Sequence, residues 1–547
     1  MREPQTDPLA AALAGRGSAT PPAAPGEGPA APGAGKAPAR RHFRAILNLA
    51  VPLILANLVQ QAYNMTDVFF LGRFRGSLAL AAAGSASQVS WILVYIFVGL
   101  SVGAGIVTAQ AYGARDPERL SRAVQTAWIL GLLSGAALTL AGAAFSPALL
   151  ALVNTPPEVL PGAAPYLRVH FASMLFYVIF LMAAAILRGT GDTRSAMWAI
   201  CLALAVKLSL VALLVGAMGG GVIQAAASTV VAQAAAAAVV TARLVSPGRP
   251  CRLRIRGARA HWPTLAGIAA IGIPTGLQSL VQYLANVYFN SQVNRFGADV
   301  MAGVVTISRL EGIIYMPIEG FALAASTLAG QLTGAGRSGE IPSVMRQTSI
   351  MSVGLVILLT LAFFRWGEAM AGVFNPLNHR AVEVTLLFLA TIVPFYFLYS
   401  LNQNFGGVIR GTGEARAPML IVLFFTCGIR VLLISLWRDE LYMLPLIYPA
   451  SWAATFLAFI AYCRLGGWLD RLEIRVPSAG AGAGDAPLPG RPVPPQEAPP
   501  PEGEPGSPTP GVAAEAVPGA PGPSSADPPE APGQAPGRVS PRPAREG

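Results

Sequence analysis

Charged side chains are scarce in this sequence of 547 residues. Asp, Glu, Lys and Arg together make up 12% of it, against roughly 25% in an ordinary soluble domain. The apolar runs 45–58, 89–107 and 350–364 contain no acid or base at all, and each approaches the roughly 20 residues that cross a bilayer core. The scarcity excludes a water-soluble globule and predicts an all-α integral membrane protein.

Cysteine and histidine are also rare, with four of each. They form neither a disulfide framework nor a metal-ligand spacing. The phosphate-binding motif G-x-x-x-x-G-K-[ST] and the zinc-protease motif H-E-x-x-H are missing. We therefore expect no metal, no cofactor and no enzymatic activity, so that any transport must draw its energy from an ion gradient or from a separate partner.

The formal net charge of +11 comes from arginines that lie between apolar runs and not on one basic face, so we expect no nucleic-acid partner. Breaks at charged and Pro/Gly-rich segments predict twelve spans, near 45–70, 78–110, 120–145, 163–187, 194–216, 221–244, 263–294, 300–332, 343–366, 382–407, 417–437 and 442–464. With the amino terminus inside, the inner segments hold twenty-one arginines and the outer loops six. This bias predicts a multi-pass protein of the inner (plasma) membrane with both termini in the cytoplasm.

An internal repeat divides the chain into two halves. The motif Arg188-Gly-Thr-Gly-Asp192 recurs 222 residues later as Arg410-Gly-Thr-Gly-Glu414, and the same offset relates Pro52 to Pro274. Because an even number of spans separates equivalent points, both halves have the same orientation. We expect two six-helix bundles related by a pseudo-twofold axis along the membrane normal.

The predicted domains follow from this repeat and from composition. Residues 43–245 form the N-terminal six-helix bundle, 246–262 a basic cytoplasmic linker, and 263–470 the C-terminal six-helix bundle. Residues 1–42 and 471–547 are rich in Pro, Gly and Ala, which favours disordered cytoplasmic tails because they cannot bury enough apolar surface.

Polar side chains form a stripe on the first span of each half. Gln60, Asn64 and Asp67 fall at i, i+4 and i+7, and the seventh span carries Gln278, Gln282 and Asn286 at i, i+4 and i+8. Such spacings place each set on one helical face. We expect the two stripes to line a cavity that the halves share; the alternative is that the amides only join helices by hydrogen bonds.

Charged residues within spans are costly, by roughly 2.5 to 3.5 kcal/mol on insertion scales. Asp67 is a natural ion-coupling group, unless it lies hydrated at the outer end of its span. Lys207 is one of only two lysines beside thirty-six arginines, and it either pairs with Asp67 or extends its ammonium towards an interface. In the eighth span, Arg309 and Glu311 are candidate cavity and substrate residues; ion pairs with other helices are the alternative.

Several linked motifs resemble the multidrug and toxic compound extrusion (MATE) family. They are the segment from Asp67 to Gly72-Arg-Phe74, the segment from Gly99 to Asp116, the Arg-Gly-Thr-Gly motif of the first half, the segment from Arg309 to Gly336, and Arg430. The resemblance covers about residues 43–470. It implies a V-shaped pair of bundles that exports small, cationic or amphiphilic organic compounds in exchange for protons or sodium.

The resemblance also bears on the coupling ion. Asp67 matches the first-span aspartate that many bacterial members use for cation coupling. Gln282 stands where one branch carries a glutamate, and Lys207 and Val211 stand where other members have Asn and Asp. These departures disfavour a sodium site and favour proton coupling through Asp67, with Lys207 as its counter-charge.

Two other functions remain open at this point. One is a lipid-linked oligosaccharide flippase of the same superfamily, and the other is a membrane scaffold that transports nothing. We further expect a monomer whose partners are a small-molecule substrate and membrane lipid.

Overall fold

The computed structural model describes residues 37–468 except 154, 249–250, 255–256, 375–377 and 438, with side chains from His42 onward. The predicted tails lie almost entirely outside the described residues, and so do Arg249 and Arg256 of the predicted basic linker.

The described part of the chain is helical and contains no strand. Its α-helices are α2 (Ala37–Gly113), α3 (Pro117–Leu152), α4 (Leu160–Gly189), α5 (Thr193–Val211), α6 (Val222–Val245), α7 (Trp262–Val293), α8 (Ala298–Gly334), α9 (Ile341–Phe374), α10 (His379–Ile392), α11 (Tyr396–Gly411), α12 (Arg416–Ile421), α13 (Ile429–Trp437) and α14 (Ile447–Leu465). Two π-helical stretches, Ala212–Ala217 and Val422–Gly428, extend α5 and join α12 to α13.

Eleven continuous helical runs among the described residues are long and apolar enough to cross a membrane. The first run, within α2, holds two spans because Gly76 breaks it with φ 80° and ψ −173°, a conformation that glycine adopts without strain. The spans therefore number twelve, as the sequence predicted. Near Pro394, one span combines α10 and α11 through the short 3₁₀ turn Val393–Phe395.

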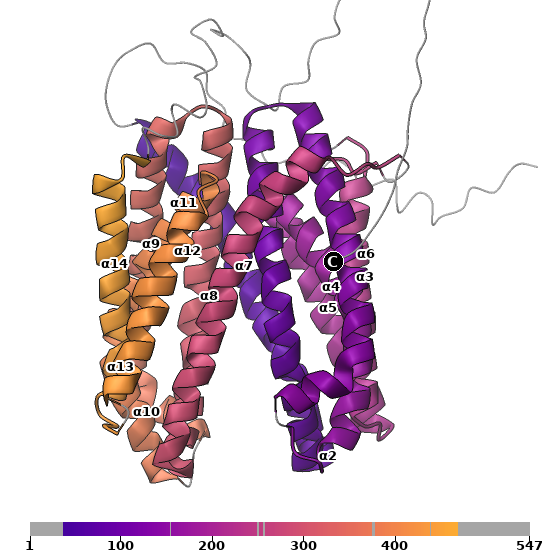
Figure 1. Ribbon diagram of the computed structural model, residues 1–547, viewed down its shortest axis with the longest axis vertical. Helices are drawn as coiled ribbons and strands as arrows, with labels where there is room; N and C mark the ends of the chain where they lie inside the picture. The colour runs from indigo at the N-terminus through magenta and orange to yellow at the C-terminus, as the bar shows by residue number, and fades with distance from the viewer. Residues whose placement is uncertain are drawn as a thin grey trace, which may run out of the picture. The chain divides into compact units, whose positions relative to one another are not determined.

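The helices form two bundles (Figure 1), each with its own apolar core. One core joins α2 to α6 around residues such as Tyr63, Phe171 and Val211. The other joins α8 to α14 around residues such as Phe388 and Trp452. The predicted all-α fold of two six-helix bundles is thus confirmed.

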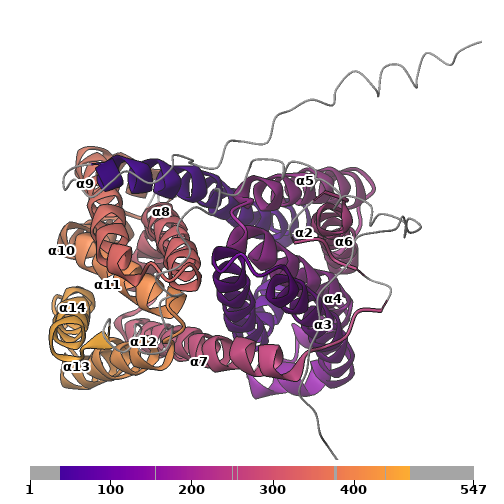
Figure 2. The same ribbon diagram turned by 90° about the horizontal axis from the view of Figure 1, so that it is seen from above.

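The first helix of each half begins against the bundle of the other half. At the start of α2, Ile46 and Leu53 pack with Phe321 and Ala324 of α8. In α7, Ile268 and Ile271 belong to the core of the first bundle. Figure 2 shows the start of α2 and the helix α7 bridging the bundles on opposite sides, which is the arrangement that the pseudo-twofold axis requires.

Glycines allow α2 and α7 to touch along their backbones. A Cβ atom at Gly99 would overlap the backbone of Gly276, and one at Gly103 would overlap that of Ile268. These residues belong to Gly99-Leu-Ser101-Val-Gly103, which has the G-x-S-x-G spacing of a hydrolase nucleophile turn. Here the motif lies within a helix, and Ser101 donates a hydrogen bond to the Val98 carbonyl at 2.7 Å. The motif therefore serves helix packing.

Two reciprocal hydrogen bonds join the bundles at the end where α4 and α11 terminate. Gln110 Nε2 donates to the Gly411 carbonyl at 3.2 Å, and Gln331 Nε2 donates to the Gly189 carbonyl at 2.9 Å. Both carbonyls belong to the repeated Arg-Gly-Thr-Gly motif, so the repeat supplies a matched contact from each half.

Candidate ion-coupling and substrate site

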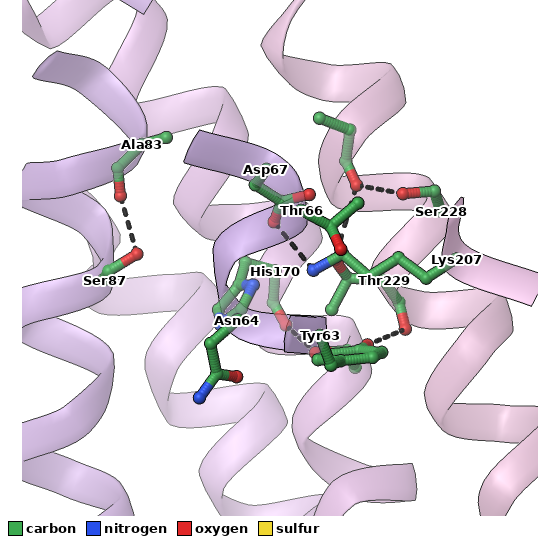
Figure 3. Close-up of polar contacts among 12 residues, drawn as sticks. Tyr63, Asn64, Thr66, Asp67, Ala83, Ser87, His170, Lys207, Ser228 and Thr229 are labelled. Atoms are coloured by element: carbon green, nitrogen blue, oxygen red, sulfur yellow. Dashed lines mark hydrogen bonds and ion pairs between the residues drawn. The ribbon is translucent and has the colours of Figure 1, made fainter. Parts of the chain in front are cut away.

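A buried ion pair lies in the first bundle. Lys207 Nζ of α5 is 3.0 Å from Asp67 Oδ2 of α2, and both residues are at least nine-tenths buried. Figure 3 shows the two side chains meeting between the helices. The structure therefore brings together the two residues that the sequence proposed as a pair, and neither extends to an interface.

Tyrosines hold both members of this pair. Tyr166 of α4 donates a second hydrogen bond to Asp67 Oδ2 at 3.2 Å. The Lys207 ammonium lies 4.1 Å from the centroid of the Tyr63 ring, where the ring quadrupole attracts a cation. Asp67 Oδ1, in contrast, is buried and has no hydrogen-bond partner among the described residues.

The pair lines a cavity of about 280 Å³ within the first bundle. Its wall includes Gln60, Asn64 and Asp67, the predicted stripe, and Gln60 donates to Asn64 at 3.2 Å. Its lining residues all come from the first half, so the second predicted stripe does not reach this cavity. The reason is that this face of the first span lies against α4, α5, α6 and the second part of α2.

Other residues that line this cavity carry buried polar atoms with no hydrogen-bond partner among the described residues. They are His170 Nδ1 and Gln233 Oε1, in addition to Asp67 Oδ1. Buried polar atoms are nearly always hydrogen-bonded. The cavity is therefore suited to a small hydrogen-bonding species next to the ion pair.

The second bundle lacks this pair at the equivalent positions. The repeat offset of 222 places Phe289 and Phe388 where the first half has Asp67 and Tyr166. Those two rings are in edge contact, with centroids 6.5 Å apart. Lys207 falls on Ile429, one residue before Arg430. An apolar contact thus replaces the carboxylate contact, and the two bundles differ in chemistry although they share a fold.

Glu311 lies in a separate buried cluster of the second bundle. Tyr396 donates to its Oε1 at 2.5 Å, and Tyr396 belongs to an aromatic group with Tyr315 and Trp452. Glu319 of the same helix accepts hydrogen bonds from Tyr399 and Gln403. These acids are held by neutral donors and not by the arginine of their own span.

Two of the three residues of the predicted stripe on α7 accept hydrogen bonds from arginines. Gln278 accepts from Arg410 Nη1 at 3.5 Å, and Asn286 accepts from Arg430 Nη1 at 2.6 Å. Gln282 makes no hydrogen bond to a described residue. None of the three lines the cavities described here, so the structure favours helix joining for Gln278 and Asn286.

Arg309 is exposed and lines two cavities between α2 and α8. Its side chain has no ion pair or hydrogen bond to the described residues. The structure thus separates Arg309 from Glu311, which the sequence had grouped together.

Sequence reasoning missed Tyr63, Tyr166 and His170. Of these, His170 had a usable signal, because an ionisable side chain within a span asks for a partner or a function. The tyrosines gave no such signal, since tyrosines in apolar spans commonly only pack against neighbouring side chains.

The sequence model of the MatE family matches residues 52–213 and 274–436, together more than half of the chain. This chain belongs to the MatE family. The two matches begin 222 residues apart, which is the offset of the repeat (274 − 52). Membership makes the protein a membrane transporter and not an enzyme, as the sequence predicted.

Curated relatives agree with this assignment. The probable multidrug resistance protein YoeA of Bacillus subtilis is 24% identical over 437 residues, covering 77% of this chain and 93% of the relative. The probable multidrug resistance protein NorM of Thermotoga maritima is 26% identical over 412 residues, covering 73% and 84%.

Solved structures share the fold of this MatE chain. One, described as the outward-facing conformation of a multidrug resistance MATE family transporter, has a TM-score of 0.73 at 21% identity and covers 79% of this chain and 97% of that one. Another, described as MATE in the bent conformation, has a TM-score of 0.72 at 21% identity and covers 81% and 99%.

Proposed function

We propose that this MatE protein exports small amphiphilic organic compounds across the plasma membrane in exchange for protons, with Asp67 and Lys207 as the coupling pair. The observation that carries the proposal is the buried contact of 3.0 Å between Lys207 Nζ and Asp67 Oδ2 beside a polar cavity. The names of the two relatives, both probable multidrug resistance proteins, support export of drug-like compounds.

Protonation provides the switch. A buried ion pair is favourable only while both members are charged, because removing one charge leaves the other unpaired in a poor solvent for ions. A proton taken up on Asp67 releases Lys207 from its partner. Lys207 is then free to reorient, and the helices α2 and α5 that carry the pair can separate.

A sodium ion fits this site less well than a proton does. Sodium needs several oxygen ligands, whereas Asp67 offers one unpartnered oxygen, and the ammonium of Lys207 beside it repels a second cation. Cationic cargo gains no support from these charges either. The only carboxylate that lines the three described cavities is Asp67, which is already paired.

The test uses purified protein in liposomes and three fluorescent probes that share one dansyl group: dansylamide, dansylglycine and dansylcadaverine. An imposed proton gradient should drive the accumulation of at least one probe, and an equal sodium gradient should not. If sodium alone drives accumulation, proton coupling is wrong. If neither gradient moves any probe while the protein is folded, the export proposal is wrong.

A further inference from the structure

A guanidinium with no ion pair among the described residues lies between the two bundles. Arg309 of α8 lines a cavity of about 680 Å³ and a second one of about 330 Å³. Among the described residues, it is the only charged side chain that lines either of them. The two nearby carboxylates of its helix, Glu311 and Glu319, accept hydrogen bonds from other side chains.

The two cavities meet at Arg309 and differ in chemistry. They share Gln61, Met65 and Arg309. The larger cavity adds the amides of Asn290 and Asn294 and the hydroxyl of Ser308. The smaller one is otherwise apolar, with lining side chains that include Leu58, Ile313, Met316, Met370 and Phe374. Arg309 therefore stands where a cavity that carries several amide and hydroxyl groups among apolar side chains meets one that is otherwise apolar.

We propose that this double cavity binds amphiphilic small molecules that carry an acidic group, with the acid on Arg309 and the apolar body among the methionines. The transport of such a ligand rests on the proposed function above, whereas its binding does not. The combined lining matches an amphiphile because the guanidinium and the amides gather around Arg309, whereas the rest of the smaller cavity is apolar.

The chemistry of the lining favours an acid over a base or a neutral group. Guanidinium binds carboxylate, sulfonate and phosphate groups through parallel hydrogen bonds. The amides of Gln61, Asn290 and Asn294 can complete the shell of such an anion. An ammonium group would meet Arg309 with no carboxylate to balance it. The methionines around Met65 suit apolar groups of varied shape, since the thioether side chain is flexible and polarizable.

The size of the cavities favours a drug-sized ligand. Pockets that bind such ligands measure roughly 300 to 1,000 Å³, and both cavities fall in this range. The proposal therefore commits to a small amphiphile that enters from water. An anionic phospholipid, which could also place a phosphate on Arg309, is the competing occupant.

The test measures binding without any gradient, in lipid nanodiscs made of zwitterionic phosphatidylcholine. We expect dansylglycine, which carries a carboxylate, to bind more tightly than dansylamide and dansylcadaverine. Arg309→Gln should weaken dansylglycine binding by about tenfold, the loss expected for one charge-assisted contact. It should leave dansylamide binding within about twofold by the same arithmetic. Arg309→Lys should retain part of the preference.

The control is Arg365→Gln, which removes an exposed arginine of α9 that lines none of the three cavities. It should bind dansylglycine as the parent does. An equal loss in this control, or an unchanged affinity in Arg309→Gln, overturns the proposal. So does complete displacement of dansylglycine when phosphatidylglycerol replaces part of the phosphatidylcholine, because the site would then be occupied by lipid.

A second variant separates this inference from the export proposal. Asp67→Asn should keep the binding of dansylglycine and lose its gradient-driven transport. Binding without transport in the parent protein would contradict the export proposal alone. Transport of dansylamide together with no dansylglycine preference would contradict the inference alone.

Discussion

Asp67 and Lys207 depend on each other because each is buried with the other as its main charged partner. Asp67 Oδ2 holds both Lys207 and Tyr166, while Oδ1 has no partner among the described residues. One oxygen thus maintains the helix contact, and the other is available to a proton. Because the two oxygens of Asp67 have different surroundings, two predictions follow for this pair.

Asp67→Asn should abolish proton-driven export, because an amide keeps the shape of the side chain but cannot take up and release a proton. We expect accumulation in proteoliposomes to fall by at least about tenfold, the equivalent of 1.4 kcal/mol or more in the coupled step. The matched control is Glu383→Gln, which neutralises an exposed acid paired with Arg380. Parent-like transport by a folded Asp67→Asn protein would remove Asp67 from the mechanism.

Lys207→Ala should destabilise the protein, because it leaves the Asp67 carboxylate buried without its cation. We expect a loss of about 3 kcal/mol, typical when one partner of a buried pair is removed. Adding Asp67→Asn to this variant should restore most of the lost stability, which thermal unfolding in detergent can measure. The pH profile of transport should also change in Lys207→Ala. No recovery in the double variant, together with an unchanged profile, would mean that Lys207 acts only by packing.

For individual residues, the sequence was informative where a charged side chain is rare in its surroundings. Asp67 and Lys207 could be predicted, since an acid and the chain's only lysine outside residue 36 both fall within apolar spans. The partner role of Tyr166 could not, because nothing local distinguishes it from a packing tyrosine. The role of Arg309 in a cavity separate from Glu311 depends on which faces of α8 meet α2, and that is a property of tertiary packing.

Among the helices, α2 and α7 are in direct backbone contact. Glycines at 99, 103, 272 and 276 remove the side chains that would hold the two backbones apart. Small residues are the usual means of close packing between membrane helices. This contact, together with the Gln110 and Gln331 hydrogen bonds, stabilises the arrangement of bundles that the structure shows.

Gly99→Ala should weaken that arrangement, because the added methyl group overlaps the backbone of Gly276. We expect a cost of about 1 to 3 kcal/mol, typical of an overfilled contact, and a matching fall in transport rate. Gly84→Ala is the control, since it changes a glycine of the same helix that has open space around it. Distances between spin labels on α2 and α7 would show the shift, and unaltered distances and rates would contradict the prediction.

The helices themselves could largely be predicted from hydropathy. The predicted spans 45–70 and 78–110 correspond to the two parts of α2 on either side of Gly76, because Gly72, Arg73 and Arg75 mark the same break in sequence. The 3₁₀ and π-helical segments could not be predicted. They depend on which backbone hydrogen bonds survive packing, and Pro394 alone does not specify that choice.

For the molecule as a whole, the repeat fixes a testable topology. Equivalent loops of the two halves should face the same side of the membrane. With the cysteines at 201, 251, 427 and 463 replaced, Ser77→Cys and Ala298→Cys should react with a membrane-impermeant maleimide in intact cells. Ala114→Cys and Ala335→Cys should react only after permeabilisation. All four positions are exposed, so burial cannot produce the difference. The reverse pattern would place both termini outside the cytoplasm.

The pseudo-twofold architecture was predictable from the polar repeat, because an even number of spans between equivalent points allows only one relative orientation. The crossing of α2 and α7 between bundles was not. Hydropathy gives the length and order of the spans. It does not show whether the first helix of a half packs against its own bundle or against the other one, because the apolar pattern is the same in both cases.

The course of α2 has a mechanical consequence. Its first turns are embedded in the apolar core formed with Phe321 and Ala324 of the opposite bundle, while Asp67, on the same continuous rod, holds Lys207 of its own bundle. A continuous helix resists bending. A change of charge at Asp67 must therefore either tilt the first part of α2 against Phe321 and Ala324 or bend this helix near Pro52. In the mechanism proposed above, protonation of Asp67 therefore shifts the two bundles relative to each other.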